Sequence, residues 1–586
     1  MVNLQKLILV DHPDKVFIRV AFLLSLISLQ GTPSFLPLVL LLTTVHLYVR
    51  TIHAKDSFGR RFLVFGLAVA LAGSLVNLSA AMYALSTSKT PLLVLAGLSL
   101  FASAISLSIF FVDVKLCGHI QAPWVRMALF PVLWTTFWTG IASVNPIGRL
   151  LMWSPVQGLG SYEWLYHISG PSGIDCAVAV CAVICSEVIG EWLMGPKVEI
   201  GGEEIRLINL DDDTPATFHH SESHHVLIFA GIMAALTLPS FALVGTPLPP
   251  SSANTTPLTV GCILPSSIYD KHHNSALEDF IAASAQMTPA KILIWPESAV
   301  TFANAEERDA AFDKVRREVR GPAIGVSFEE FVPAEPGGRI RMKRNGFALL
   351  APNNTDGPAV TLEYYKRHLV PVAESFSLIP SSDPPTIVSL DLVHPKHVTK
   401  PDWAPAPNYT RSIPVTASIC LDFSSSSAFS ALSSRPALIL APARTWHPGI
   451  GLTMWEQAKA RAEEIGSMVL WCDGGEGGVS GVAGGGMTEF MQFGEGSWSR
   501  TIGVQWPFDE SPTVYARWGD WYTVLVLWLL FVVAFSAGVK SDVQDPLGIY
   551  SAMRGVRRIL ASFSEWKNKR KALTESQNGE SQPLLV

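Results

Sequence analysis

Charged residues are scarce in this chain of 586 residues. Asp, Glu, Lys and Arg make up 16% of the sequence and hydrophobic residues 49%, whereas soluble domains carry about 25% charged residues. This deficit excludes a disordered or fibrous protein and indicates that much of the chain lies in a membrane. Basic charge is not in excess either, and a net charge of −6 gives no support for nucleic-acid binding. Seven Cys residues are too few for a disulfide framework.

Long apolar runs mark the expected membrane spans, because a helix needs about 20 apolar residues to cross a bilayer. Seven runs precede a change of composition near residue 247 and one follows it. They lie at 16–33, 35–50, 62–85, 91–112, 127–147, 173–193, 226–246 and 519–538. We therefore expect a seven-helix transmembrane domain over 1–246, a last transmembrane helix over 519–538 and a basic tail over 539–586.

Between residues 247 and 518 the apolar runs shorten to strand length and alternate with helical patterns. The strand-like runs are 259–264, 291–295, 322–327, 346–351, 413–421, 437–441 and 467–472, and the helical patterns are 275–287, 303–320 and 453–466. This alternation predicts an α/β sheet domain, and about 270 residues can bury a core of their own. The expected fold class is a multi-pass α-helical membrane domain plus an α/β domain.

The positions of Lys and Arg predict the orientation, because cytosolic loops are enriched in both. Basic residues concentrate in the loops at 51–61 and 113–126 and in the tail. These three segments lie on the same side of the membrane if seven helices precede the α/β domain. We therefore expect that domain on the non-cytosolic side, which is the periplasm, the cell exterior or an organelle lumen. Sequons at Asn254, Asn353 and Asn408 fit a luminal glycoprotein, although such tripeptides also arise by chance.

Three residues in the α/β region carry reactive chemistry. Glu297 follows a hydrophobic strand in KILIWPES, Lys366 follows a strand-like segment in EYYKRHLVPVAE, and Cys420 ends the β-rich run VTASIC. Cys is a strong nucleophile when a base removes its proton, a buried Glu can be that base, and Lys can stabilise an oxyanion. Taken singly, each is more often a packing residue, a turn or a solvated side chain. Together and in this order they predict a catalytic site.

The order Glu297, Lys366, Cys420 resembles the catalytic triad of the nitrilase, or carbon–nitrogen hydrolase, superfamily. Other segments resemble its membrane-embedded branch, the apolipoprotein N-acyltransferases. These segments are KRHLVPVAE, ICLDF, WEQAKARAEEIGSMVL and TVYARWGDW. The resemblance implies an α-β-β-α sandwich with Glu374 and Asp422 supporting the triad. From the residues alone, these two acids could instead be ion-pair partners of Arg367 or Arg461.

The sequence also departs from that family's pattern. Leu421 follows the nucleophile where the family has Tyr, and Asp473-Gly474-Gly475 stands where it has Asn-Asn-Gly. The resemblance still implies that Cys420 takes an acyl group from a phospholipid donor as a thioester and passes it to a protein or small-molecule amine, with no cofactor. The departures leave the amine acceptor open. A membrane-anchored nitrilase-type amidase fits the triad equally, and a binding protein on an inactive fold is a third interpretation.

Several further residues have two interpretations. Phe376, Leu378, Trp446 and Trp455 are candidates for loops that face membrane lipid, and the alternative is a satellite core beneath these loops. We expect no metal site, because the His-rich segment 219–225 is more readily a solvated linker. Cys472 is more readily a packing residue, although pairing with Cys262 or Cys420 is open in an oxidising compartment.

Overall fold

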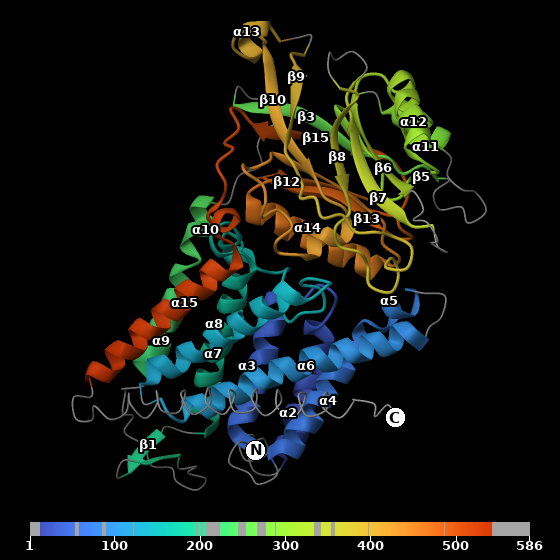
Figure 1. Ribbon diagram of the computed structural model, residues 1–586. Coiled ribbons are helices and arrows are strands. Elements are labelled where there is room, and N and C mark those ends of the chain that lie inside the picture. The colour runs from blue at the N-terminus through green and yellow to red at the C-terminus, as the bar shows by residue number, and fades with distance from the viewer. Residues whose placement is uncertain are drawn as a thin grey trace, which may run out of the picture.

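The computed structural model describes residues 12–52, 58–84, 89–120, 122–194, 197–200, 203–206, 223–243, 254–266, 277–287, 289–332, 341–352, 358–395, 398–485 and 487–541. It consists of a helical region and an α/β region (Figure 1). This confirms the expected fold class. The expected boundary at 246/247, the sequon residue Asn353, His219 and His220, and the tail from residue 542 onward lie outside the described residues.

The helical region is built from long apolar helices. They are α2 (Pro13–Ser28), α3 (Phe35–Ile52), α4 (Phe58–Val76), α6 (Lys89–Cys117), α7 (Pro123–Val144), α8 (Leu165–Met194) and, from the far end of the chain, α15 (Val514–Ser541). Shorter elements are α5 (Leu78–Met82), η2 (Gly160–Tyr162), α9 (Ser223–Ala235), α10 (Leu238–Leu243) and the hairpin of β1 (Lys197–Ile200) and β2 (Glu203–Arg206).

Seven helical segments of the described chain are long and apolar enough to cross a membrane. They are Phe35–Ile52, Phe58–Val76, Lys89–Cys117, Pro123–Val144, Leu165–Leu193, His224–Ala242 and Val514–Ser536. The first expected run, 16–33, is not among them. It forms α2, whose 16 residues reach only about 24 Å at ~1.5 Å per residue, less than the ~30 Å of a hydrocarbon core. The last span begins at Val514 rather than 519.

Helix α8 is the centre of the helical bundle, since it packs against α3, α7 and α15. A backbone break at Gly170, with φ of 60°, interrupts it. The break lets α15 approach closely: a Cβ at Gly170 would lie 2.1 Å from the ring of Tyr515. Many large apolar side chains on the outer helix faces remain exposed, among them Leu63, Leu93 and Val533. An apolar outer surface of this kind suits contact with lipid.

The α/β region contains two sheets. The first has the order β15 (Trp498–Gln505), β3 (Thr255–Cys262), β4 (Ile292–Ile294), β6 (Ala323–Phe331), β7 (Lys343–Leu350) and β8 (Val360–Tyr365), with β5 (Val300–Phe302) paired to β6. The second has the order β14 (Met487–Phe493), β13 (Val479–Gly484), β12 (Met468–Asp473), β11 (Leu438–Ala443), β10 (Thr410–Ala417) and β9 (Val388–Val393).

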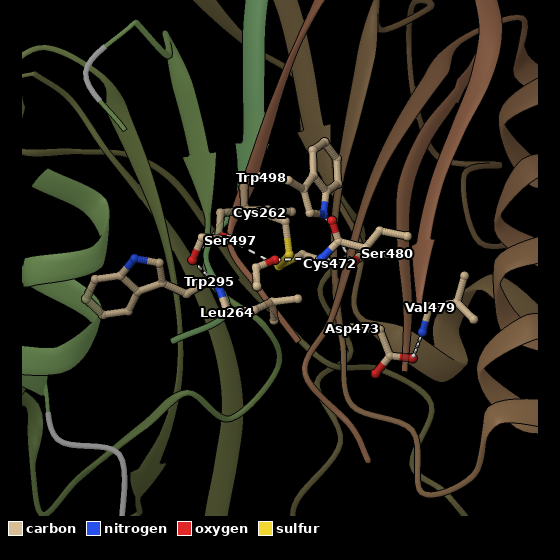
Figure 2. Close-up of a disulfide and its surroundings, with 12 residues drawn as sticks. Cys262, Leu264, Trp295, Cys472, Asp473, Val479, Ser480, Ser497 and Trp498 are labelled. Carbon is tan, nitrogen blue, oxygen red and sulfur yellow. Dashed lines mark hydrogen bonds between the residues drawn. A yellow bond between two sulfur atoms is a disulfide. The ribbon is translucent and has the colours of Figure 1, made fainter. Parts of the chain in front are cut away.

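The two sheets face each other across one apolar core. Buried side chains of both sheets form a single cluster, which includes Val260 and Ile294 from the first sheet and Val415 and Leu440 from the second. A disulfide between Cys262 of β3 and Cys472 of β12 joins the sheets (Figure 2). Of the pairings left open by the sequence, the structure therefore has the one that leaves Cys420 free.

Helices cover the outer faces of the sandwich. Helices α11 (Leu277–Gln286) and α12 (Ala305–Glu318) pack on the first sheet, where Phe280 and Phe312 contribute to a second apolar cluster. Helix α14 (Pro448–Ile465) packs on β12 and β13 of the second sheet. The arrangement is the α-β-β-α sandwich that we expected. Helix α14 also contacts α5, α8 and α15, so it lies between the sandwich and the helical region (Figure 1).

Candidate active site

Glu297 lies just beyond the C-terminal end of the buried strand β4. Pro296 cannot donate a backbone hydrogen bond to a sheet, so the strand ends before it. The N–H of Glu297 donates to the carbonyl of Ala443, 3.2 Å away in the second sheet. Its buried Oε1 accepts hydrogen bonds from Asn345 Nδ2 at 2.7 Å and from Lys366 Nζ at 2.7 Å. The sequence analysis did not single out Asn345, which is a buried polar residue within the strand β7.

Lys366 follows the last residue of β8 and is buried between two carboxylates. Its Nζ lies 2.7 Å from Glu297 Oε1 and 2.7 Å from Glu374 Oε1. The other oxygen of Glu374 accepts the N–H of Val370 at 2.7 Å, which ties the loop after Lys366 to the ammonium group. The ammonium is thus held at a fixed position beside Glu297.

Cys420 begins the short 3₁₀ turn η4 (Cys420–Ser424) after strand β10. Its φ of +45° is rare for a residue other than Gly and requires support from the surroundings. The carboxylate of Glu297 and the backbone of Arg444 lie close enough to the sulfur to affect the pKa of the thiol. The structure thus brings the three expected residues together, from the ends of strands in both sheets.

Asp422 connects the nucleophile turn to the end of β8. Its Oδ1 accepts the N–H of His368 at 2.7 Å, and its Oδ2 accepts the hydroxyl of Tyr364 at 2.8 Å. Its partners include the N–H of Arg367, at 3.2 Å, but not the guanidinium of that residue. Arg461, the other partner considered, lies 2.5 Å from Glu464 instead. Asp422 and Glu374 therefore both hold the segment that carries Lys366.

Burial sets the protonation of the three groups. Burial raises the pKa of Glu297, and the charge of Lys366 only partly offsets this. Burial works against the charged form of Lys366, but the nearby carboxylates, above all Glu297, raise its pKa beyond the ordinary value. Burial and the charge of Glu297 raise the pKa of the Cys420 thiol well above its ordinary value. Cys420 is therefore a thiol at rest, and it needs a base at the moment of attack.

A buried carboxylate holds the loop next to the nucleophile. Asp473 is fully buried and accepts the N–H of Thr445 at 2.9 Å and the N–H of Gly475 at 2.9 Å. Gly475 must be Gly here, because a Cβ would lie 1.6 Å from the carbonyl oxygen of Thr445. This carboxylate thus fixes the chain that follows Arg444, whose backbone lies beside Cys420.

Two of the four expected lipid-facing residues are not on the surface, which corrects the sequence prediction. Leu378 is 6% exposed and Trp455 is fully buried. Leu378 forms a bridge with Lys343 beside the first sheet. Trp455 faces β13, where it comes within 3.1 Å of a Cβ built at Gly481. Phe376, at 73%, and Trp446, at 37%, are exposed, and Trp446 donates to the carbonyl of Ala80 in α5 at 3.0 Å.

The helical region directly contacts the turn that carries Cys420. Arg149, in the loop between α7 and α8, donates its N–H to the carbonyl of Ser424 at 2.9 Å. Its buried guanidinium lies 3.0 Å from Asp175 in α8 and 3.4 Å from Asp520 in α15. Asp520 also accepts the hydroxyl of Ser172 in α8 at 2.8 Å. The segment after the nucleophile therefore rests on a buried charge network that joins two candidate membrane helices.

The neighbouring residue, Gly148, offers a test of this contact. Gly148 has φ of 54°, and a Cβ there would lie 2.2 Å from the carbonyl oxygen of Ser424. We expect Gly148→Ala to displace the nucleophile turn and to slow alkylation of Cys420 by about 10²-fold, because a displaced thiol loses the general base Glu297, whose help is worth roughly 10²–10⁴-fold. Site-resolved mass spectrometry of iodoacetamide labelling measures this rate.

Gly160 is the matched control for Gly148. It has nearly the same φ, 53°, but no atom lies within 4 Å of a built Cβ. Gly160→Ala should therefore add the same backbone strain and leave the labelling rate of Cys420 near that of the wild type. Equal rates in both variants would contradict the idea that this contact positions the nucleophile.

Metal-binding residues do not gather in the described chain. No group of three His, Cys, Asp or Glu side chains is placed there to hold a metal ion. His224 and His225 stand near the start of α9, which leaves the rest of the His-rich segment outside the described residues.

Comparison with known proteins gives little further information. No protein-family model matches the sequence, and a search of curated proteins finds no match. Among solved structures, the chain is similar to the NitFhit protein of C. elegans, with 15% identity and a TM-score of 0.28. The match covers 43% of this chain and 61% of that one. A likeness this weak carries no argument about function.

Proposed function

We propose that the chain is a membrane-bound N-acyltransferase that moves a fatty acyl group from a phospholipid to an amine through a thioester on Cys420. The observation that carries the proposal is the buried cluster of Glu297, Lys366 and Cys420. Cys420 lies on a turn that contacts Arg149 of the helical region. A nucleophile where the α/β region meets helices long and apolar enough to cross a membrane suits a substrate that remains in the bilayer. The sequence resemblance to apolipoprotein N-acyltransferases supports the same activity.

In the first half-reaction, Glu297 takes the proton of the Cys420 thiol as the sulfur attacks an ester carbonyl of the phospholipid. Lys366 stabilises the oxyanion that develops on the carbonyl oxygen. When the tetrahedral intermediate collapses, the carbon–oxygen ester bond breaks and the lysophospholipid leaves with the proton from Glu297. The acyl group remains on the sulfur as a thioester.

In the second half-reaction, a primary amine attacks the thioester carbonyl and Glu297 takes a proton from the nitrogen. The carbon–sulfur bond breaks, the amide product leaves, and the Cys420 thiolate recovers its proton from Glu297. An amide is more stable than a thioester, so the transfer needs no further energy source or cofactor. Exclusion of water from the buried site protects the thioester from hydrolysis.

Intact-mass analysis of the purified protein after incubation with phospholipid tests the proposal. We expect a mass increase of one fatty acyl chain, which peptide mapping assigns to Cys420. Addition of a primary amine should discharge the adduct as an amide. Release of free fatty acid in place of the amide would indicate a hydrolase, and absence of any adduct would indicate a binding protein.

The raised pKa of Glu297 predicts how acylation depends on pH. A general base must be unprotonated, so the rate should fall as the pH drops through the pKa of Glu297 in the folded protein. Because burial raises this pKa above the ordinary value of 4.5, the loss of rate should begin at a higher pH than for an exposed Glu. Single-turnover acylation between pH 4 and 8 measures the profile. The Glu297→Gln variant should lack this acidic limb, and a limb that persists would exclude Glu297 as the base.

The proposed orientation predicts N-glycosylation when the protein is made in a eukaryotic cell. Asn254 and Asn408 begin sequons in the α/β region, and both are exposed. We expect endoglycosidase treatment to lower the apparent mass and the double variant Asn254→Gln, Asn408→Gln to reduce this change. As a second readout, protease added to the cytosolic side of sealed vesicles should leave the α/β region intact. Digestion of the α/β region would contradict the assigned orientation.

A further inference from the structure

A cavity of about 520 Å³ lies between the helical region and the α/β region. The end of α7, the segment after the nucleophile turn, the end of α14 and the start of α15 form its walls. The residues that matter for its chemistry are His368, Ser425, Ser427, Arg517, Trp518 and Trp521. Glu297, Lys366 and Cys420 do not line it, so it is separate from the candidate active site.

The charges that line the cavity leave a positive surplus. Of the two carboxylates, Asp520 lies 3.4 Å from the guanidinium of Arg149, and Glu464 lies 2.5 Å from that of Arg461. Burial also raises the pKa of Glu464 to about 8, so this group adds little negative charge at neutral pH. In the described chain, the exposed guanidinium of Arg517 has no ion pair or side-chain hydrogen bond. An uncompensated guanidinium in a concave site favours an anion, and phosphate above all.

The remaining lining provides both polar and apolar contacts. The hydroxyls of Ser425 and Ser427 hydrogen-bond to each other at 3.0 Å, which leaves the O–H of one of them to donate to a phosphate oxygen. Trp518 and Trp521 are exposed at the start of α15, one of the candidate membrane spans. Trp residues at this level of a membrane helix sit among lipid headgroups. A free phosphate ion would use only the polar part of this lining, whereas a lipid would use both parts.

From this arrangement we propose that the cavity binds the phosphate-bearing headgroup of a membrane phospholipid. Arg517 pairs with the phosphate, one hydroxyl of the Ser425–Ser427 pair donates to a phosphate oxygen, and the two Trp side chains contact the glycerol and the first part of the acyl chains. The site lies at the junction of membrane helices and α/β domain, where a headgroup meets the protein without leaving the bilayer. It binds lipid without covalent chemistry and does not depend on acyl transfer at Cys420.

Binding of short-chain lipids to the full-length protein in detergent tests this proposal. Native mass spectrometry and titration would compare dihexanoyl phosphatidic acid, dihexanoylglycerol and inorganic phosphate. We expect binding of the phosphatidic acid and at least tenfold weaker binding of the other two. In Arg517→Gln, affinity for the phosphatidic acid should fall about tenfold or more, since a hydrogen bond to a charged group is lost.

Two further variants complete the experiment. Arg500→Gln removes the same charge from an exposed position on β15, where Arg500 lies over the ring of Phe490 and away from the cavity lining. This variant should bind the phosphatidic acid as the wild type does. Ser427→Trp should block binding by filling the cavity from an exposed position that does not disturb the core. Equal affinity for dihexanoylglycerol would overturn the phosphate assignment, and equal affinity for inorganic phosphate would overturn the lipid assignment. Unchanged binding in Arg517→Gln would overturn the site itself. Because binding is measured without turnover, these outcomes are independent of whether Cys420 forms a thioester.

Discussion

Replacing Cys420 with Ala should abolish both the acyl adduct and all transfer to amine. The thioester mechanism depends on the sulfur of Cys420, and the next residues of the turn, Leu421 and the hydrogen-bonded Asp422, offer no thiol in its place. The loss should therefore reach the detection limit and not stop at a partial decrease. Intact-mass analysis and amide formation, measured on the same preparation, give two independent readouts of the variant.

The Cys420→Ser variant is the control for shape. A Ser hydroxyl preserves the volume of the site but has a far higher pKa than a thiol, so Glu297 cannot readily deprotonate it. We expect Cys420→Ser to bind phospholipid and to form no adduct within the time of wild-type turnover. Normal transfer by folded Cys420→Ala would exclude this residue as the nucleophile and with it the proposed mechanism.

The second large effect is expected at Lys366, and the structure sharpens its design. Loss of a group that stabilises an oxyanion typically costs roughly 3–4 kcal/mol, or several hundredfold in rate. However, Lys366 also neutralises Glu297 and Glu374, each with an oxygen 2.7 Å from its Nζ. Removal of one member of a buried ion pair costs about 3–5 kcal/mol in stability. Lys366→Met should therefore lower both the acylation rate and the melting temperature.

A double variant separates the two roles of Lys366. Adding Glu374→Gln removes one of the stranded carboxylates and should restore part of the melting temperature. The acylation rate should remain several hundredfold low, because the oxyanion still lacks its cation. Recovery of rate together with stability would show that Lys366 acts only through the fold. Single-turnover acylation and thermal unfolding on the same samples decide between these results.

The sequence predicted the strands that are buried on both faces, because such strands appear as continuous apolar runs. The runs at 291–295, 437–441 and 467–472 became β4, β11 and β12, whose side chains are buried on both faces of their sheets. Strands β13 and β15 were missed because they lack such runs. In β13, Gly481 replaces an apolar side chain, since a Cβ there would lie 2.3 Å from the carbonyl oxygen of Phe490. In β15, the three consecutive polar residues Ser499, Arg500 and Thr501 interrupt the apolar ones.

The candidate site was predictable only at the ends of strands. Glu297, Lys366 and Cys420 each follow a hydrophobic or strand-like segment, and the three together and in this order, not any one of them, predicted the site. The run at 413–421 did not reveal that β10 ends at Ala417 and that the chain reverses at Cys420 with positive φ. The contacts of Arg149 were also out of reach, because its partners lie in helices that begin at Leu165 and Val514. Local patterns carry no information on contacts between segments this far apart.

The place of β3 in its sheet has a consequence for how the protein is synthesised. This strand is the first of the α/β region to leave the ribosome, yet it lies between β4 and β15, and its Cys262 is bonded to Cys472. Strand β15 ends at Gln505, and the last membrane helix starts at Val514. The sandwich therefore cannot close until nearly all of it has been translated. Its unpaired edges and apolar inner faces are exposed during this interval, when chaperones are most needed, and insertion of the last helix follows almost at once.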